Sequence, residues 1–188
     1  MDNATPLSGP SPRQLSPDQA ATMPASLYLT GTRGPRLRDR LAIRWTAQPG
    51  LLIPLPTGVR WDTVRMPADL GMAVLTSLLA STKPERIGPV LLNEDTGHTY
   101  WLTTLGTQPD DTWSSIHPSV ELLPPGTPVH MPDPCPNPLM TEFREGPELV
   151  TWSHWPTVTG TLTPAVWIAV TAAASHTRRA APSRQGPT

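Results

Sequence analysis

The sequence has few of the residues on which several common protein classes depend. Cys135 is the only cysteine among 188 residues, which excludes an intrachain disulfide and a cysteine-rich zinc site. Lys83 is the only lysine among 14 basic residues, an arginine bias typical of a GC-rich bacterial genome. No run approaches about 18 consecutive apolar residues, and the first residues lack the basic and apolar regions of a signal peptide. These absences predict a cytoplasmic protein without a membrane segment.

The overall charge gives no sign of a partner, because 14 basic and 15 acidic residues leave a formal net charge of -1. Attraction for nucleic acid would therefore have to be local. One segment, residues 26–45, gathers basic side chains: Arg33, Arg36, Arg38, Arg40 and Arg44. Guanidinium groups pair with phosphate oxygens. These arginines are thus candidate nucleic-acid contacts, and a solvated segment without a ligand is the alternative.

Proline is abundant, and phenylalanine is nearly absent. The 26 prolines are far above the usual share of about 5%, which predicts many turns, short strands and few long helices. With one phenylalanine and seven tryptophans, the aromatic part of the core should be mostly indole. Residues 1–26 and 177–188 have the composition of disordered tails, so a single domain is expected over 27–176.

The first half of this domain has the pattern of two strands followed by a helix. Leu51 to Ile53 should form a strand, residues 54–58 a turn, and residues 61–65 a second strand. Pro67 suits the first helical position and Asp69 the first turn, which predicts a helix over 67–81. The spacing predicts a buried stripe of Leu70, Ala73, Val74, Ser77, Leu78 and Ser81.

The second half predicts two hairpins, a strand and a closing helix. The hairpins are residues 89–104, with a turn at 94–97, and residues 120–131, around a Pro-Pro-Gly turn. A strand follows in residues 148–156. Thr163 should cap a helix over 164–176. Its predicted buried face is Val166, Trp167, Val170 and Ala174. The layout is α+β, a mainly antiparallel sheet with two principal helices packed on it.

The stretch "RWDTVRMPAD" raises the question of a metal site. A strand offers two ligands on one face as Asp-x-Asp, because side chains alternate. Asp62 and Asp69 are seven residues apart and lie in different elements. This spacing favours a solvated strand aspartate and a helix-dipole aspartate. An unorthodox metal set would combine them with Glu121.

Three other groups have two interpretations each. In "NEDTGH", Asn93, Glu94, Asp95 and His98 could hold a divalent ion, but the composition is also that of a hairpin turn. In "WSHWP", Trp152 and Trp155 could stack on bases or belong to the core. Cys135 would need a basic neighbour to act as a nucleophile, and the sequence offers none; no histidines have zinc-ligand spacing.

Four segments between Leu52 and about Ala173 occur in a characteristic order: "LIPLPTGVRWDTVRMPADLG", "IGPVLL", "HTYWLTTLG" and "VELLPPG", followed by a helix with Trp167. In this order they resemble the N-terminal domain of bacterial bifunctional DNA primase/polymerases, in the archaeo-eukaryotic primase superfamily. The resemblance implies the same prim-pol-like fold, in a shortened form.

The resemblance also places the family's functional positions on this sequence. Active members hold metal ions with an acidic pair at the end of a strand, and these positions are Arg65 and Pro67 here. Neither residue can ligate Mg²⁺. The nucleotide-contacting histidine falls at His98 or Thr99, and the third acid at Glu121. The resemblance thus implies the fold and argues against the activity.

The leading hypothesis is a catalytically inactive primase/polymerase-like domain, a small cytoplasmic regulatory module that binds DNA or another protein and needs no metal or cofactor. A second hypothesis is an active nucleotidyltransferase that uses Asp62, Asp69 and Glu121. A third is a protein-interaction subunit without nucleic-acid binding, which would use the proline-rich loop at 132–138 and the N-terminal tail.

Overall fold

The computed structural model of the chain describes residues 34–48, 50–107, 112–133, 149–156 and 160–180. Most of both predicted tails, Arg33, Cys135 and most of the proline-rich loop lie outside these ranges. No helix in the described ranges has the length and apolar character needed to cross a bilayer. The elements are α3 (Gly34–Ala47), β1 (Ile53–Pro56), β2 (Asp62–Pro67), α4 (Ala68–Ser81), η1 (Pro84–Arg86), β3 (Val90–Asn93), β4 (His98–Thr103), α5 (Thr112–Ile116), β5 (Glu121–Leu122), β6 (Pro128–Met131), β7 (Val150–His154) and α6 (Ala165–Ala180).

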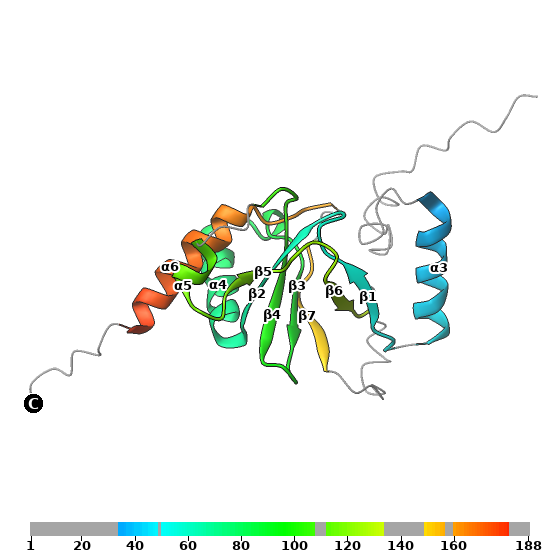
Figure 1. The fold of residues 1–188 in the computed structure, drawn as a ribbon, viewed down its shortest axis with the longest axis horizontal. Helices are drawn as coiled ribbons and strands as arrows, with labels where there is room; N and C mark the ends of the chain where they lie inside the picture. Colours follow the sequence, from blue (N-terminus) through cyan, green and yellow to red (C-terminus); the bar gives the residue numbers. More distant parts are fainter. Residues whose placement is uncertain (1–33, 49, 108–111, 134–148, 157–159, 181–188) are drawn as a thin grey trace, which may run out of the picture.

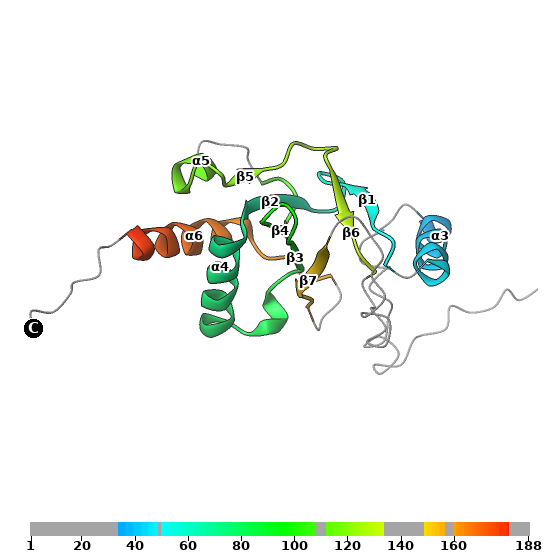
Figure 2. The same cartoon turned by 90° about the horizontal axis from the view of Figure 1, so that it is seen from below.

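The strands form two antiparallel sheets, as the α+β prediction requires. Five strands pair in the order β5-β2-β4-β3-β7, and β1 pairs with β6 in a separate two-stranded sheet. Helices α4 and α6 pack against each other, and α4 also contacts β2 and β4. Figures 1 and 2 show α4, α5 and α6 on one side of the five-stranded sheet, and β1, β6 and then α3 on the other.

Two apolar clusters fill the spaces between these layers. The first, under the helices, includes Val64, Met66, Trp101 and Ile168, all fully buried. The second includes Leu102 of the large sheet, Met131 of β6, and Leu41 and Trp45 of α3. Side chains alternate along a strand, so β4 sends Trp101 into the first cluster and Leu102 into the second. Trp101 and Trp45 confirm that indole supplies much of the aromatic core.

The predicted strand-to-helix corner is present, with one shift. Pro67 ends β2 and occupies the N-cap position of α4, with φ -52°, whereas we predicted it as the first helical residue. Asp69 lies in the first turn, and α4 ends at Ser81, both as predicted. The buried stripe is Leu70, Gly71, Val74, Leu75 and Leu78. The prediction of Ala73, Ser77 and Ser81 on this stripe was wrong, because the buried side of α4 is turned toward β4, where Gly71 lies over Thr99.

The first predicted hairpin is confirmed. Val90 to Asn93 pairs with His98 to Trp101 in antiparallel register. The turn lies at residues 94–97: Asn93 Oδ1 accepts a hydrogen bond from the Thr96 amide at 3.0 Å, and Gly97 has φ +66°. Glycine reaches this conformation without the strain that a side chain would cause. The turn interpretation of "NEDTGH" therefore holds in the structure.

The second predicted hairpin, residues 120–131, was wrong. β5 pairs with β2, whereas β6 pairs with β1 in the other sheet. The Pro-Pro-Gly turn carries the chain between the sheets, and the Gly126 amide donates to the Thr57 carbonyl at 2.8 Å. β1 also includes Pro54 and Pro56, which we predicted as part of a turn. Both prolines are exposed, and β1 pairs with only one other strand, β6. Proline has no backbone N–H, and an edge strand tolerates this because one of its sides needs no hydrogen bonds to a neighbouring strand.

The predicted buried face of α6 was wrong in part: its two valines and Ala174 are exposed, whereas Trp167 packs on the first apolar cluster, as predicted. Val166 and Val170 are 61% and 65% exposed, while Ile168 and Ala172 are fully buried. α6 packs against α4, and small side chains such as Ala172 allow two helices to approach closely. The helix also continues to Ala180, beyond the predicted end at 176. α3, for which no secondary structure was predicted, is a further long helix.

Candidate functional site

The three carboxylates of the nucleotidyltransferase hypothesis do not come together. Asp62 opens β2 and Asp69 follows its end, so the strand alone separates them by about 16 Å at about 3.3 Å per residue. The Asp62 carboxylate is buried and accepts the Thr107 amide at 2.8 Å. Arg65 is the register partner of Glu121, so these two side chains lie on the same side of the sheet. Asp62 is three residues from Arg65 on the same strand, and because side chains alternate, Asp62 faces the opposite side. Within the described ranges, no three His, Cys, Asp or Glu side chains form a possible metal site.

The positions that the primase/polymerase resemblance selects do come together. Arg65 and Pro67 lie two residues apart on β2 and so share a face of the large sheet. Glu121 of β5 is the register partner of Arg65, and His98 of β4 is the partner of Pro67. Tyr100 lies opposite Arg65 on the other side. We call these five residues the Arg65 face; the register of three strands brings them together.

An ion pair occupies the centre of the Arg65 face. Arg65 Nη2 lies 2.9 Å from Glu121 Oε1, and the two side chains are 37% and 46% exposed. The guanidinium repels a divalent cation and engages the one carboxylate that could otherwise bind it. The residues of this face therefore do not fit the metal ions that the family resemblance implies.

The structure separates the two candidates for the family's histidine position. Thr99 is fully buried beneath α4, with its hydroxyl donating to the Met66 carbonyl at 3.4 Å. His98 points to the other side of the sheet, where it shares the Arg65 face. Among the described residues, His98 Nδ1 and Arg65 Nε are buried without a hydrogen-bond partner. Two buried polar nitrogens are thus available beside the ion pair.

The Arg65–Glu121 pair should contribute little to stability because solvent reaches both side chains. A double-mutant cycle with Arg65→Gln and Glu121→Gln is expected to give a coupling free energy of about 0.2–1 kcal/mol at low salt. Urea unfolding at low and high NaCl measures it, and the value should fall as salt screens the charges. A coupling that is zero at low salt, or that is unchanged by salt, would contradict this account of the pair.

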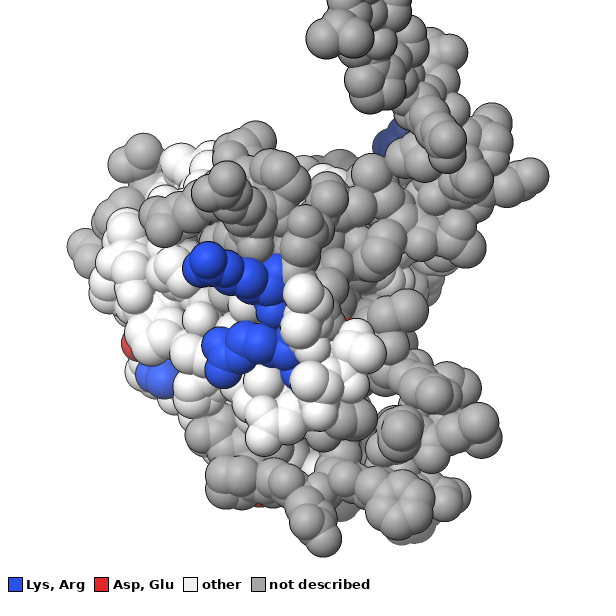
Figure 3. Space-filling view, turned by 90° about the vertical axis from the view of Figure 1, so that its right-hand side faces the viewer, with Lys and Arg blue, Asp and Glu red and all other residues white. Residues whose placement is uncertain are grey.

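The basic cluster of the sequence lies on α3, on the far side of β1 and β6. Arg40 and Arg44 are exposed and one helical turn apart, whereas Leu41 and Trp45 face the second apolar cluster. Arg36 and Arg38 belong to the same helix. Figure 3 views the molecule from the α3 side and shows basic side chains near the middle of this face, with few acidic atoms among the described ones. The burial of Leu41 and Trp45 holds the two arginines toward solvent.

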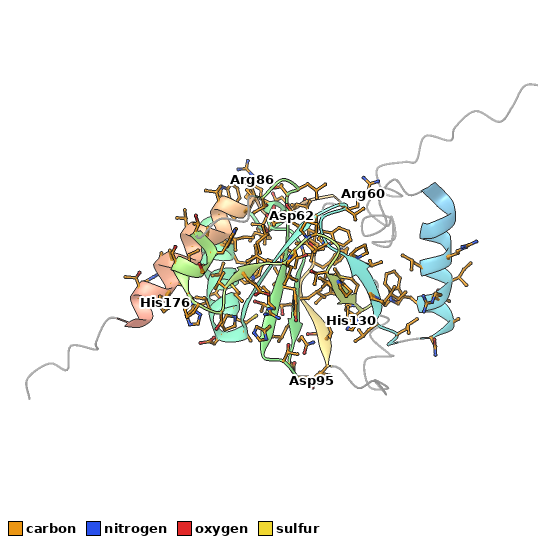
Figure 4. The ribbon with its side chains drawn as sticks, in the orientation of Figure 1. Arg60, Asp62, Arg86, Asp95, His130 and His176 are labelled. Carbon is orange, nitrogen blue, oxygen red and sulfur yellow. The ribbon has the colours of Figure 1, made fainter. Side chains whose placement is uncertain are left out.

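The remaining candidates have structural partners. Asp95 Oδ2 accepts the Leu149 amide at 2.7 Å, and Figure 4 shows Asp95 and Asp62 at opposite ends of the large sheet. The rings of Trp152 and Trp155 meet edge to face, with centroids 4.6 Å apart, and both pack on the second apolar cluster. The core interpretation of these tryptophans is thus confirmed, and Asp95 serves to join the hairpin turn to the start of β7.

Sequence reasoning missed Tyr100 on the Arg65 face and the exposure of the α6 valines. Tyr100 follows His98 in "HTYWL", but its position opposite Arg65 depends on the β2–β4 register, for which the sequence carries no local signal.

Comparison of the chain with known protein families, curated proteins and solved structures found no match.

Proposed function

We propose that the protein is a primase/polymerase-like domain that has lost its metal ligands and acts as a regulatory module that binds nucleic acid. The observation that carries this proposal is the Arg65–Glu121 ion pair at 2.9 Å. It stands where the resemblance puts the metal-binding acids. A nucleotidyl transferase needs carboxylates that converge on divalent ions, and this face offers one carboxylate that is already paired.

The second support is the placement of Arg40 and Arg44. Like charges at positions i and i+4 of a helix repel and slightly destabilise it, so this pair is poorly explained by helix stability alone. Arg44 in the last turn is favourable toward the helix dipole, but Arg40 is not in that turn. A row of phosphates would compensate both charges at once. The arginines Arg36, Arg38, Arg40 and Arg44 are proposed to contact the nucleic-acid backbone.

Fluorescence anisotropy with labelled single- and double-stranded DNA tests this proposal. We expect binding at about 50 mM salt that weakens steeply toward about 200 mM, because phosphate contacts release counterions. The Arg40→Ala/Arg44→Ala variant should bind about tenfold more weakly or worse. Its log–log salt dependence should be shallower by about one to two units, since each lost phosphate contact removes about 0.9.

The control variant removes the same charge elsewhere. Lys83→Ala/Arg178→Ala deletes two exposed basic side chains, one at the N-cap of η1 and one on α6, on the helical side of the molecule. It should bind DNA nearly as the unaltered protein does. Equal losses in both variants would show that only net charge matters. Absence of binding at low salt would contradict the proposal and favour a protein partner.

A primer-extension assay tests the enzymatic alternative. With a primed template, nucleotides and Mn²⁺, the protein is expected to extend no primer, because Asp62, Asp69 and Glu121 are separated. Extension by the unaltered protein that disappears in Asp62→Ala would contradict the inactive assignment. Asp62→Ala is also expected to leave DNA binding unchanged, since Asp62 bonds to Thr107 and lies over the large sheet, away from α3 (Figure 4).

A further inference from the structure

Two valines on α6 are among the most exposed large apolar residues of the described chain. Val166 and Val170 are 61% and 65% exposed and lie four residues apart, on the same face of the helix. These valine side chains do not pack in the core, and as apolar groups they do not make the surface more soluble. An i, i+4 apolar pair left in water is typical of a helix face that packs on another surface.

The same valines form one wall of a groove between α4 and α6. The groove has a volume of about 360 Å³; Leu78 and Trp167 contribute to its apolar lining. Hydroxyl side chains and Arg86 complete the lining. Figure 4 shows Arg86 projecting beside the first turn of α6. The two projecting valines and the groove beside them thus form one continuous patch, which we call the α6 patch (Leu78, Arg86, Val166, Trp167, Val170).

We propose that the α6 patch is an interface between two copies of this chain. A two-fold dimer uses the same surface on both subunits, so that surface must contain both the projecting and the receiving parts. The α6 patch meets this condition. With the two α6 helices antiparallel, Val166 of one copy can meet Val170 of the other, and each pair lies beside the partner's groove.

Charge also favours a second copy over another partner. Arg86 lines the groove and the exposed Glu85 is its neighbour on η1, so each copy carries both signs of charge at this end of the patch and a second copy can set a carboxylate against a guanidinium. The formal net charge of -1 sets little long-range repulsion between copies. A small amphipathic anion could reach Arg86 and the groove, but it would leave the outward sides of both valines in water.

Analytical ultracentrifugation of the full chain, from low micromolar to a few hundred micromolar, tests the proposal without nucleic acid. The weight-average mass should rise from 20.3 kDa toward about twice that value. Val166→Asp and Val170→Asp should each keep the mass of one chain throughout, because each would bury a carboxylate against a valine of the second copy. Both sites are exposed, so circular dichroism melts at low concentration should match the unaltered protein.

Leu105→Asp is the matched control. Leu105 is 50% exposed on the turn after β4, outside the α6 patch, and this variant should associate as the unaltered protein does. A mass of one chain at every concentration would overturn the proposal. So would association that survives both valine substitutions, or that Leu105→Asp abolishes equally. The DNA titration of the α3 arginines does not depend on these outcomes.

Discussion

Replacing Arg65 and Pro67 together by aspartate is expected to create a Mn²⁺ site on the Arg65 face. The two positions lie two residues apart on β2, with Glu121 opposite the first and His98 opposite the second. Directly opposed residues of antiparallel strands have Cβ atoms about 4.5–5.5 Å apart. Three carboxylates and one imidazole would therefore converge, and the repelling guanidinium would be gone. Mn²⁺ accepts such oxygen and nitrogen ligands.

The backbone permits these changes. Pro67 has φ -52° and ψ 141° at the N-cap of α4, a conformation open to any residue, and aspartate is among the preferred N-cap residues. Arg65 is partly exposed, so its replacement leaves no cavity in the core. The variant should fold with nearly unchanged stability, apart from the small contribution of the lost ion pair.

Isothermal titration with MnCl₂ measures the gain. Arg65→Asp/Pro67→Asp should bind Mn²⁺ at least about tenfold more tightly than the unaltered protein, a difference of about 1.4 kcal/mol. Arg65→Asn/Pro67→Asn is the matched control, because it removes the guanidinium and the proline without adding charge. Arg65→Asp alone should bind less well than the double variant. If the double aspartate variant binds no better than the double asparagine variant, these positions are not a degenerate metal site.

Local features of the sequence were sufficient for some elements. The β2–α4 corner was predicted because Pro67 and Asp69 mark a helix start and Leu70, Val74 and Leu78 repeat at helical spacing. The turn at 94–97 was predicted because asparagine and glycine satisfy its backbone directly, as the Asn93–Thr96 hydrogen bond shows. In both cases the residues that determine the element lie within the element itself or a few residues from it.

Elements that depend on distant partners could not be predicted in the same way. Nothing in residues 120–131 indicates that β5 pairs with β2 and β6 with β1, because the Pro-Pro-Gly turn is compatible with a hairpin or a crossing. Part of the buried face of α6 was mispredicted for a similar reason. Hydrophobicity favours burial of Val166 and Val170, but close packing on α4 selects Ala172 and Ile168 instead.

The candidate site combines both situations. The positions Arg65, Pro67, His98 and Glu121 could be named from the sequence through the resemblance, but not their mutual arrangement. The ion pair depends on β2–β5 register, and the assignment of His98 rather than Thr99 to this face depends on β2–β4 register. A shift of either strand by one residue would turn these side chains to the opposite face.

Gly71→Ala is expected to lower the free energy of unfolding by about 1–3 kcal/mol, the usual range for overpacking a close contact. Gly71 is buried on α4 against β4. An added Cβ would overlap Thr99, with the Thr99 Cβ 2.8 Å and Cγ2 2.9 Å away and Thr99 Oγ1 closer still. Thr99 is fully buried and cannot swing aside. Helix propensity alone would favour alanine by about 1 kcal/mol, so the sign of the change reports the contact.

Urea unfolding of Gly71→Ala, Thr99→Ala and the double variant separates these effects. Thr99→Ala removes Oγ1 and Cγ2, two of the three close atoms, and leaves only Cβ, so the double variant should be more stable than the sum of the single losses predicts. Thr76→Ala, at an exposed position of the same helix, should have almost no cost. Unchanged stability in Gly71→Ala would mean that α4 can move away from β4 freely. It would then be a poor anchor for β4, whose other face presents His98 beside the Arg65–Glu121 pair.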